Sequence, residues 1–242
     1  MEGIEKLQRL IDQSNRIVFF GGAGVSTESG IQDFRSVDGL YNQQFDYPPE
    51  TILSHSFFMR HTEAFYKFYQ TKMLYSGILP NAAHKKLAEM EAAGRLSAVI
   101  TQNIDGLHQL AGSKNVLELH GSMLRNRCVR CGQAYPIDAM RGPGVPRCEC
   151  GGIIKPDVVL YEEALDNDTV ERAVAQLRGA DLVIVGGTSL AVYPAAGLLN
   201  YVRGKIVLIN RDATRLDGAA ELVLSAAIGE VLSQITVGAA SR

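Results

Sequence analysis

The feature that most constrains the fold is a series of short, almost continuous apolar runs, each followed directly by a glycine or a polar residue. The runs cover residues 16–20, 98–100, 116–119, 182–185, 206–209 and, more weakly, 222–224. Runs of this length are typical of strands that are buried on both faces, as the strands of a parallel sheet are. The sequence therefore predicts a core of parallel strands.

Helical patterns lie between several of these runs. The predicted helices cover residues 4–11, 83–93 and 169–177. Asp166 and Asp168 are the two candidate N-caps of the last one. Because strands alternate with helices, we expect an α/β protein with an open, doubly wound sheet.

Two segments interrupt this alternation. Residues 36–79 are rich in aromatic side chains and read mostly as helical, whereas residues 125–155 contain all four cysteines and a link rich in glycine and proline. We interpret both segments as insertions that form a second, smaller domain. The large domain would then consist of residues 1–35, 80–124 and 156–242.

The composition is that of a globular protein, with 46% apolar and 21% charged residues among 242. The 24 basic and 26 acidic side chains give a net charge of −2, so no electrostatic footprint indicates binding to nucleic acid or to an anionic membrane. We find no secretory signal pattern and no stretch near the roughly 20 apolar residues of a membrane helix. We therefore expect a cytoplasmic protein.

A glycine-rich segment, residues 21–27, directly follows the first predicted strand. Glycines let backbone N–H groups approach a phosphate closely, and a helix start would add its positive dipole end. The candidate ligands are Gly22, Ala23, Gly24 and Thr27. The segment lacks the third glycine of the dinucleotide fingerprint, and no acidic residue follows about 20 positions later. A tight turn without a ligand is the alternative.

An aromatic residue and an arginine, Phe34 and Arg35, come shortly after this segment. The guanidinium group can clamp a pyrophosphate while the ring covers a reacting centre. The alternative is a surface ion pair between Asp33 and Arg35.

Polar residues also follow the other predicted strands. They are Gln102, Asn103 and Asp105 around Ile104, then His120, then Gly187, Thr188 and Ser189, and finally Asn210. In an open α/β sheet the carboxyl ends of the strands face the ligand crevice. Helix capping, turn chemistry and a structural role for a lone histidine are the alternatives. Convergence on one sheet edge favours a site, with His120 as general base because imidazole titrates near neutrality.

The four cysteines have the spacing of metal ligands. Cys128 and Cys131 are followed, after sixteen residues, by Cys148 and Cys150. In a reducing compartment such thiols are more often ligands than disulfides, and four of them can close a tetrahedral zinc site that is structural rather than catalytic. Four buried free thiols remain an alternative. So does a zinc ribbon that binds nucleic acid, although the local charge is only mildly basic.

Taken together, these motifs resemble the sirtuins, the NAD-dependent protein deacylases, over nearly the whole chain. The matching segments are residues 22–26, 30–35, 101–105, 120–121, the four cysteines, 155–159, 187–190 and 209–210. The resemblance implies a Rossmann-like large domain and a small domain formed by a zinc module and a helical module. NAD, a consumed co-substrate, would lie in the cleft between them.

The resemblance also implies roles for individual residues. His120 and Asn103 would be catalytic. The cofactor loop would contain Gly22, Ala23, Gly24, Thr27, Phe34 and Arg35; the nicotinamide half of NAD would contact Gln102, Asn103, Ile104 and Asp105; and the adenosine half would contact Gly187, Thr188, Ser189, Asn210 and Ala227 or Ile228. Val158, Val159, Leu160 and Tyr161 would bind the acylated substrate, with the peptide pairing as an added strand.

The reaction implied by the resemblance transfers an acyl group from lysine to ADP-ribose and releases nicotinamide, acyl-ADP-ribose and free lysine. His120 would deprotonate a ribose hydroxyl. Protein mono-ADP-ribosylation in the same site is one alternative, and a non-catalytic NAD-binding module is another, which has no chemical need for His120 and Asn103. We expect a monomer whose partners are acetylated proteins or peptides.

The chain departs from the sirtuin pattern at a few positions. Gln32 replaces a proline, Lys155 replaces an arginine, and residues 160–163 replace an aromatic pair followed by Gly-Glu. The members that prefer succinyl-lysine carry a tyrosine and an arginine three residues apart, and here the best counterpart is Tyr69 with Lys72. Because an ammonium group matches a carboxylate less well than a guanidinium fork, we favour acetyl and other uncharged acyl groups.

Overall fold

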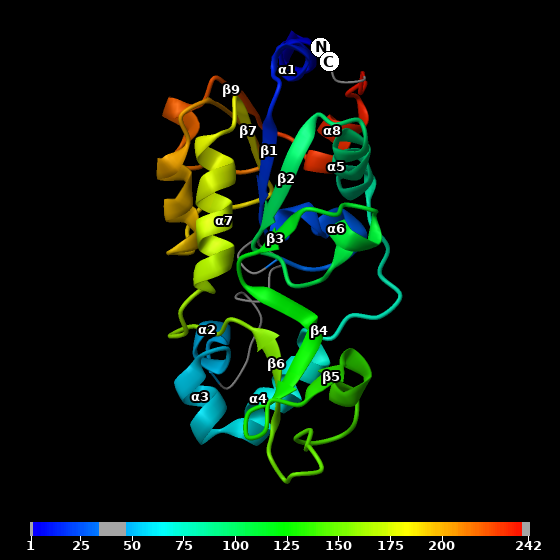
Figure 1. Ribbon diagram of the computed structural model, residues 1–242, viewed down its shortest axis with the longest axis vertical. Helices are drawn as coiled ribbons and strands as arrows, with labels where there is room; N and C mark the ends of the chain where they lie inside the picture. Colours follow the sequence, from blue (N-terminus) through cyan, green and yellow to red (C-terminus); the bar gives the residue numbers. More distant parts are fainter. Residues whose placement is uncertain (1, 34–46, 239–242) are drawn as a thin grey trace.

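The computed structural model describes residues 2–33 and 47–238 and consists of two lobes built on different sheets (Figure 1). The large lobe contains a six-stranded parallel sheet. Its strands are β1 (Ile17–Gly21), β2 (Leu96–Thr101), β3 (Val116–Glu118), β7 (Leu182–Gly186), β8 (Lys205–Ile209) and β9 (Leu222–Leu224). Each predicted apolar run overlaps one of them, to within one residue at the ends, which confirms the predicted parallel core.

The strand order is β3-β2-β1-β7-β8-β9. This is the order of the dinucleotide-binding doubly wound fold, in which two halves run outward from the centre. The order reverses between β1 and β7, and ligands of such sheets bind outside the carboxyl ends of the strands at that point. The predicted Rossmann-like α/β class is thus confirmed.

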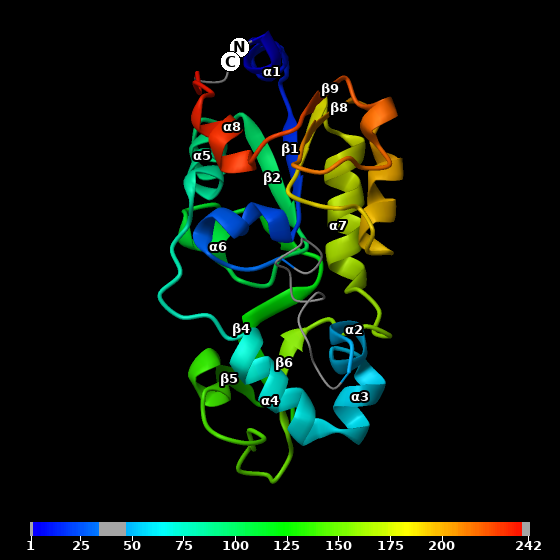
Figure 2. The same cartoon turned by 180° about the vertical axis from the view of Figure 1, so that it is seen from behind.

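Helices cover both faces of the parallel sheet (Figures 1 and 2). One face carries α1 (Glu2–Gln13), α5 (Ala82–Ala92), α6 (Leu107–Leu110) and α8 (Ile228–Ser233), and the other carries α7 (Asn167–Arg178) and the 3₁₀ segment η5 (Ala195–Tyr201). Neighbouring strand residues alternate between these layers. Phe19 and Ile184 pack on the first layer, and Phe20 and Val185 pack on the second. The central strands of the parallel sheet are therefore buried on both faces.

Local capping explains where two of the predicted helices begin. Asp166, not Asp168, caps α7, because its carboxylate accepts a hydrogen bond from Thr169 N at 2.8 Å. Asn81 caps α5 in a reciprocal capping box whose third helical residue is His84 rather than the usual glutamate or glutamine.

The small lobe joins two segments that are far apart in the sequence. Its helices are α2 (Pro49–Ile52), α3 (His55–Arg60) and α4 (Thr62–Lys72), and its antiparallel sheet contains β4 (Gly121–Cys128), β5 (Ala134–Pro136) and β6 (Ile154–Val158) in the order β5-β4-β6. Phe65 and Tyr66 of α4 pack in one core with Ile154 and Leu160. The mostly helical prediction is confirmed for the described part of residues 36–79, whereas the boundaries between the two domains stay a prediction.

The remaining described elements are short. They are the 3₁₀ turns η1 (Ala23–Val25), η2 (Thr27–Ser29), η4 (Ile137–Met140) and η6 (Asp217–Ala219). Within residues 2–33 and 47–238, no helix has both the length and the apolar character needed to cross a membrane.

Two histidines are buried against each other beneath the parallel sheet. His84 of α5 and His108 of α6 are 0% and 1% exposed, and their ring centroids are 4.7 Å apart. Burial lowers the pKa of His84 to about 4, and burial together with the neighbouring His84 lowers that of His108 to about 3. Both rings are therefore neutral in the folded protein at pH 7.

We expect this pair to make the fold sensitive to mild acid. An unfolded chain takes up protons as the pH falls below the ordinary histidine value of 6.5, but the folded rings do not until about pH 4. The free energy of unfolding should thus fall across that window, by up to about 1.4 kcal/mol per pH unit for each histidine. Urea titrations between pH 7 and 4.5 should show that the free energy of unfolding decreases less in His108→Leu than in the wild type.

The exposed variant His61→Gln serves as the control. If His108→Leu lost stability with falling pH as steeply as the wild type, the buried pair would not cause the dependence.

Candidate active site

Two glycine turns meet where the strand order reverses. Gly24, after β1, donates a backbone hydrogen bond to Gly187 O, after β7, at 2.8 Å. A Cβ on Gly24 would lie 2.8 Å from the Gly187 Cα, and a Cβ on Gly187, whose φ is +58°, would collide with Val25 N. Because backbone lies on backbone, both positions require glycine. The first turn continues as 3₁₀ turns rather than the predicted helix start.

A cavity of about 320 Å³ opens beside these turns and extends to the small lobe. Among its lining residues are the predicted Gly22, Ala23, Gly24, Gln102, Asn103, Ile104, Asp105, His120, Val158, Val159, Leu160, Tyr161, Gly187, Thr188, Ser189 and Asn210. Loops that follow five strands of the parallel sheet, β1, β2, β3, β7 and β8, thus converge with the end of β6.

A second cavity, of about 370 Å³, adjoins the first along Gly24, Gly187 and Asn210. It is lined by the other predicted residues Thr27, Ala227 and Ile228. The two cavities share the glycine turns, so together they form one elongated site across the switch point. Phe34 and Arg35 lie outside the described residues.

A chain of hydrogen bonds orients the polar residues after β2. The Asn103 side-chain amide donates to Ser26 Oγ at 3.0 Å, and Ser26 Oγ donates to an oxygen of Asp105 at 2.7 Å. The other Asp105 oxygen accepts from Leu107 N at 2.9 Å. Burial raises the pKa of the Asp105 carboxyl, against the effect of these two donors. The network fixes Asn103 at the cavity wall.

Gln102 links the two sides of the switch point. Its side-chain amide donates to Thr188 Oγ1 at 3.1 Å, and its backbone carbonyl lies 3.0 Å from His120 Nδ1. Since a carbonyl oxygen can only accept, we assign the ring hydrogen to Nδ1, which leaves Nε2 as the unprotonated nitrogen. Burial lowers the pKa of His120, while the bond to Gln102 opposes that shift. The ring is therefore neutral at pH 7 and can accept a proton.

The backbone after His120 ties this ring to the small lobe. Gly121 has a φ of +74°, and a Cβ there would collide with Asp157 O, so the chain can turn tightly only with glycine. Val159 N donates to His120 O at 3.0 Å, which places residues 158–159 beside the imidazole. Because β6 is an edge strand of its sheet among the described residues, a peptide could pair with the outer side of its end.

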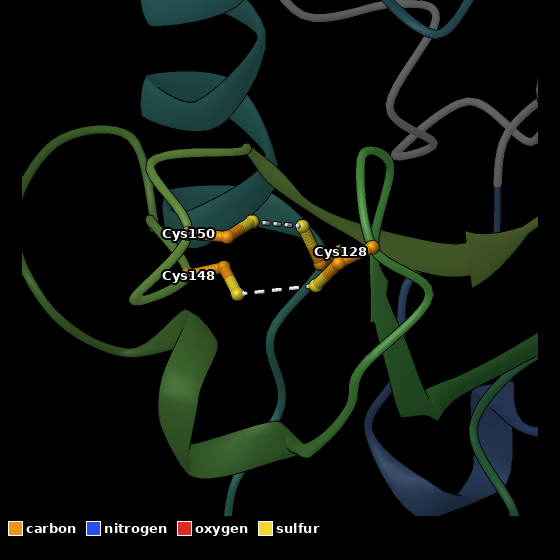
Figure 3. Close-up of side chains that lie close together, drawn as sticks. Cys128, Cys148 and Cys150 are labelled. Carbon is orange, nitrogen blue, oxygen red and sulfur yellow. Dashed lines mark hydrogen bonds between the residues drawn. The ribbon is translucent and has the colours of Figure 1, made fainter.

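The four cysteines form a cluster at the far end of β4 and β6. Figure 3 shows the sulfur atoms of Cys128, Cys148 and Cys150 gathered together. All four Sγ atoms lie within 4.8 Å of one another, and Cys128–Cys150 and Cys131–Cys148 are each 3.5 Å apart. A tetrahedral zinc with bonds of about 2.3 Å would hold its sulfur ligands about 3.8 Å apart, so the cluster fits one ion.

Hydrogen-bond donors favour the thiolate forms of two of the four cysteines, Cys128 and Cys148. Tyr135 donates its hydroxyl hydrogen to Cys148 Sγ at 3.1 Å, and Arg130 N lies 3.4 Å from Cys128 Sγ as a donor. Gly152 leaves space for the sulfur cluster, because a Cβ at this position would lie 2.6 Å from the Cys128 sulfur. The donor set is complete and closed, as in structural zinc sites.

Sequence reasoning missed several residues of the site. Ser26 lies within the glycine-rich motif and binds both Asn103 and Asp105, and a hydroxyl group two residues after Gly24 could have been a signal. From the small lobe, Leu53, Met73 and Tyr75 line the main cavity. No motif marks these three, because only the packing of the helical segment against β6 brings them to the wall.

Comparisons with known proteins agree with this geometry. The model of the Sir2 family matches residues 22–194. The NAD-dependent protein deacetylase of Clostridium acetobutylicum is 54% identical over 241 residues, covering 97% of this chain and 98% of the relative. That of Clostridium perfringens is 56% identical over 238 residues, with coverages of 96% and 98%.

Solved structures lead to the same family. A structure described as the basis for the mechanism and regulation of Sir2 enzymes has a TM-score of 0.88 at 39% identity and covers 96% of each chain. A complex of Sir2 with p53 peptide and NAD⁺ has a TM-score of 0.85 at 38% identity and covers 95% of each chain. The match of the family model to most of the chain, and relatives at this level of identity, show that the chain belongs to the Sir2 family.

Proposed function

We propose that this protein is an NAD-dependent protein deacetylase, which transfers the acyl group of an acylated lysine to ADP-ribose and releases nicotinamide. The observation that carries this proposal is the elongated site itself. A neutral His120, the oriented Asn103 and the outer edge of β6 lie around one cavity at the switch point of the parallel sheet, which supports the proposal. The relatives that bear this name cover nearly the full length of the chain.

The residues of the site fit NAD. Gly24 and Gly187 let the two turns touch, and both glycines line the two cavities in which the dinucleotide would lie. The second cavity, with Asn210 and Ala227, suits the adenosine half, and the network around Asn103 and Asp105 suits the nicotinamide half. NAD supplies the electrophilic sugar and the leaving group for this reaction.

The chain's own residues would perform three tasks. The edge of β6 would bind the substrate peptide by backbone pairing. The cavity would hold the weakly nucleophilic amide oxygen of the acylated lysine in line for the reaction and limit its contact with water. Asn103, held by Ser26, contacts polar groups of the bound substrates. His120 Nε2 accepts a proton from a hydroxyl group, because its Nδ1 hydrogen is engaged by Gln102 O.

The wall of the main cavity favours an uncharged acyl group. Tyr69 lines it, but Lys72 is absent from the described residues that do so. We therefore propose acetyl-lysine rather than succinyl-lysine as the preferred substrate. We further propose that the protein acts as a monomer in the cytoplasm, without a nucleic-acid partner.

The function is tested by incubating purified protein with NAD and acetylated or succinylated peptide. Mass spectrometry then identifies every product. Deacetylated peptide with acetyl-ADP-ribose supports the proposal. A mass gain of ADP-ribose on the protein would instead indicate mono-ADP-ribosylation, and unchanged NAD would indicate a binding module.

We expect the protonation of His120 to determine the acid limb of the pH profile of kcat/KM. Its lowered pKa means that the ring stays unprotonated below the ordinary value of 6.5, so kcat/KM should fall only when the pH drops through that lower value. His120→Asn keeps a donor for Gln102 O but has no base, and it should lower kcat by about 100-fold or more. Steady-state kinetics between pH 5 and 8 measure both effects.

Glu171→Gln, on the exposed side of α7, is the matched control. Retention of full turnover in His120→Asn would refute the assignment of the base.

Metal analysis should find about one zinc per chain, held by the four cysteines. Cys148→Ser removes a buried ligand and should lower the zinc content, decrease the melting temperature by about 5 °C or more and disturb the small lobe. The exposed Val129→Ala, in the same turn as Cys131, is the control. A Cys148→Ser protein with wild-type stability and no zinc would show that the cluster is not a structural metal site.

A further inference from the structure

Glu162 adopts a backbone conformation that side chains disfavour. Its φ is +75°, and among the described residues only Leu190 is another non-glycine with a positive φ. Glycine adopts this left-handed conformation freely, whereas a residue with a Cβ is strained by it. An unfavourable residue at such a position calls for a compensating contact.

The Glu162 carboxylate makes that contact with the start of α3. One carboxylate oxygen accepts from Ser56 N at 2.9 Å, and the other accepts from Ser56 Oγ at 2.9 Å. Ser56 N belongs to the first turn of α3, where backbone N–H groups have no partner within the helix. These two bonds lower the pKa of Glu162, so the group is ionised at pH 7.

The segment that carries Glu162 is also the wall of the main cavity. Residues 158–163 all line it, beginning where the substrate peptide would pair with β6. Tyr161 forms a parallel bridge with the chain before α3, donating to Leu53 O and accepting from His55 N, each at 2.9 Å. The backbone contacts of Tyr161 and the side-chain contacts of Glu162 therefore both run between the cavity wall and the helical segment.

The next residue, Glu163, ties the same wall to its own strand. Its carboxylate accepts from Lys155 Nζ at 3.1 Å and from Leu160 N at 2.9 Å, and it lies 2.9 Å from His55 Nδ1. Glu163 thus holds residues 155–163 together as a unit. Both side-chain hydrogen bonds that the structure shows for Glu162 go to Ser56 of α3, so Glu162 acts with Tyr161 and Glu163 to place this unit against the helical segment.

We propose that Glu162 is a positioning residue for the acylated substrate. By accepting two hydrogen bonds from Ser56, its carboxylate fastens residues 158–163 to α3 and sets the shape of the cavity mouth. The role in substrate binding rests on the proposed function, whereas the link between Glu162 and Ser56 rests on the structure alone. A glycine would form the same turn more easily, so what Glu162 adds is the side-chain link to Ser56.

The proposal is tested by separating the strained backbone from the carboxylate. Glu162→Gly relieves the strain and removes the link, whereas Glu162→Ala removes the link and keeps the strain. In both, the KM for acetylated peptide should rise about tenfold, with kcat and the KM for NAD within about twofold of wild type. The melting temperature should fall in Glu162→Ala but not in Glu162→Gly. A merely structural role would lower the melting temperature and kcat together.

Two further variants test whether Ser56 is the partner. Glu162→Gln keeps an oxygen acceptor for the Ser56 hydroxyl and should stay within about threefold of the wild-type KM. Ser56→Ala loses one of the two bonds and should have a smaller effect than Glu162→Ala. The double variant should behave as Glu162→Ala alone, because the hydroxyl then has no carboxylate to bind. Additive effects would contradict the direct contact.

Hydrogen exchange gives a readout that needs no catalysis. The His55 and Tyr161 amides bridge the two segments, and in Glu162→Gly they should exchange about tenfold faster, with α5 unchanged as the internal reference. Unaltered exchange there would overturn the proposal whatever the activity of the enzyme. If the wild type failed to deacetylate any peptide, the proposed function would fail, and the exchange rates would still decide the role of Glu162.

Discussion

The contact between Gly24 and Gly187 is the constraint on which the rest of the site depends. It joins the turns after β1 and β7 backbone to backbone, at the point where the strand order reverses. Side chains at either position would push the turns apart. Because the turns touch, the polar residues that follow the neighbouring strands reach a common space, and Gln102 can bond to Thr188 across it.

The position of the catalytic base depends on residues that are close to the glycine turns. The Gln102 carbonyl orients His120, and Gly121 then lets the chain turn sharply into β4. Through the pairing of β4 with β6, the imidazole and the edge that would bind a peptide are parts of one backbone arrangement. The zinc-binding cluster lies at the opposite end of these strands. Its expected role is to stabilise the small lobe and so to hold β6 in place, without taking part in the reaction.

Much of this arrangement could be predicted from the sequence, because buried parallel strands have a simple signature. The run at 182–185 needs no context to be recognised, and the polar residues after such runs must lie at one edge of the sheet. The antiparallel strand β4 was not foreseen. Its sequence is largely polar and half exposed, and its partner β6 contains a proline, so neither resembles an apolar run.

Other features depend on tertiary packing that no local pattern reports. Ser26 becomes important only because Asn103 and Asp105 approach it from another loop. Tyr75 and Met73 reach the cavity only because the helical segment packs on β6. The deviation at residues 160–163 was visible in the sequence, but its meaning was not, since the link from Glu162 to Ser56 joins positions more than 100 residues apart.

The central claim is that the two touching glycine turns create the dinucleotide site, and calorimetric titration with NAD tests it most directly. We predict measurable binding to the wild type and at least about tenfold weaker binding to a folded Gly187→Ala variant, since the added Cβ separates the turns. Gly218→Ala, at a position with open space around it, should bind as the wild type does. Absence of heat with the wild type, or equal affinity in Gly187→Ala, would contradict the account.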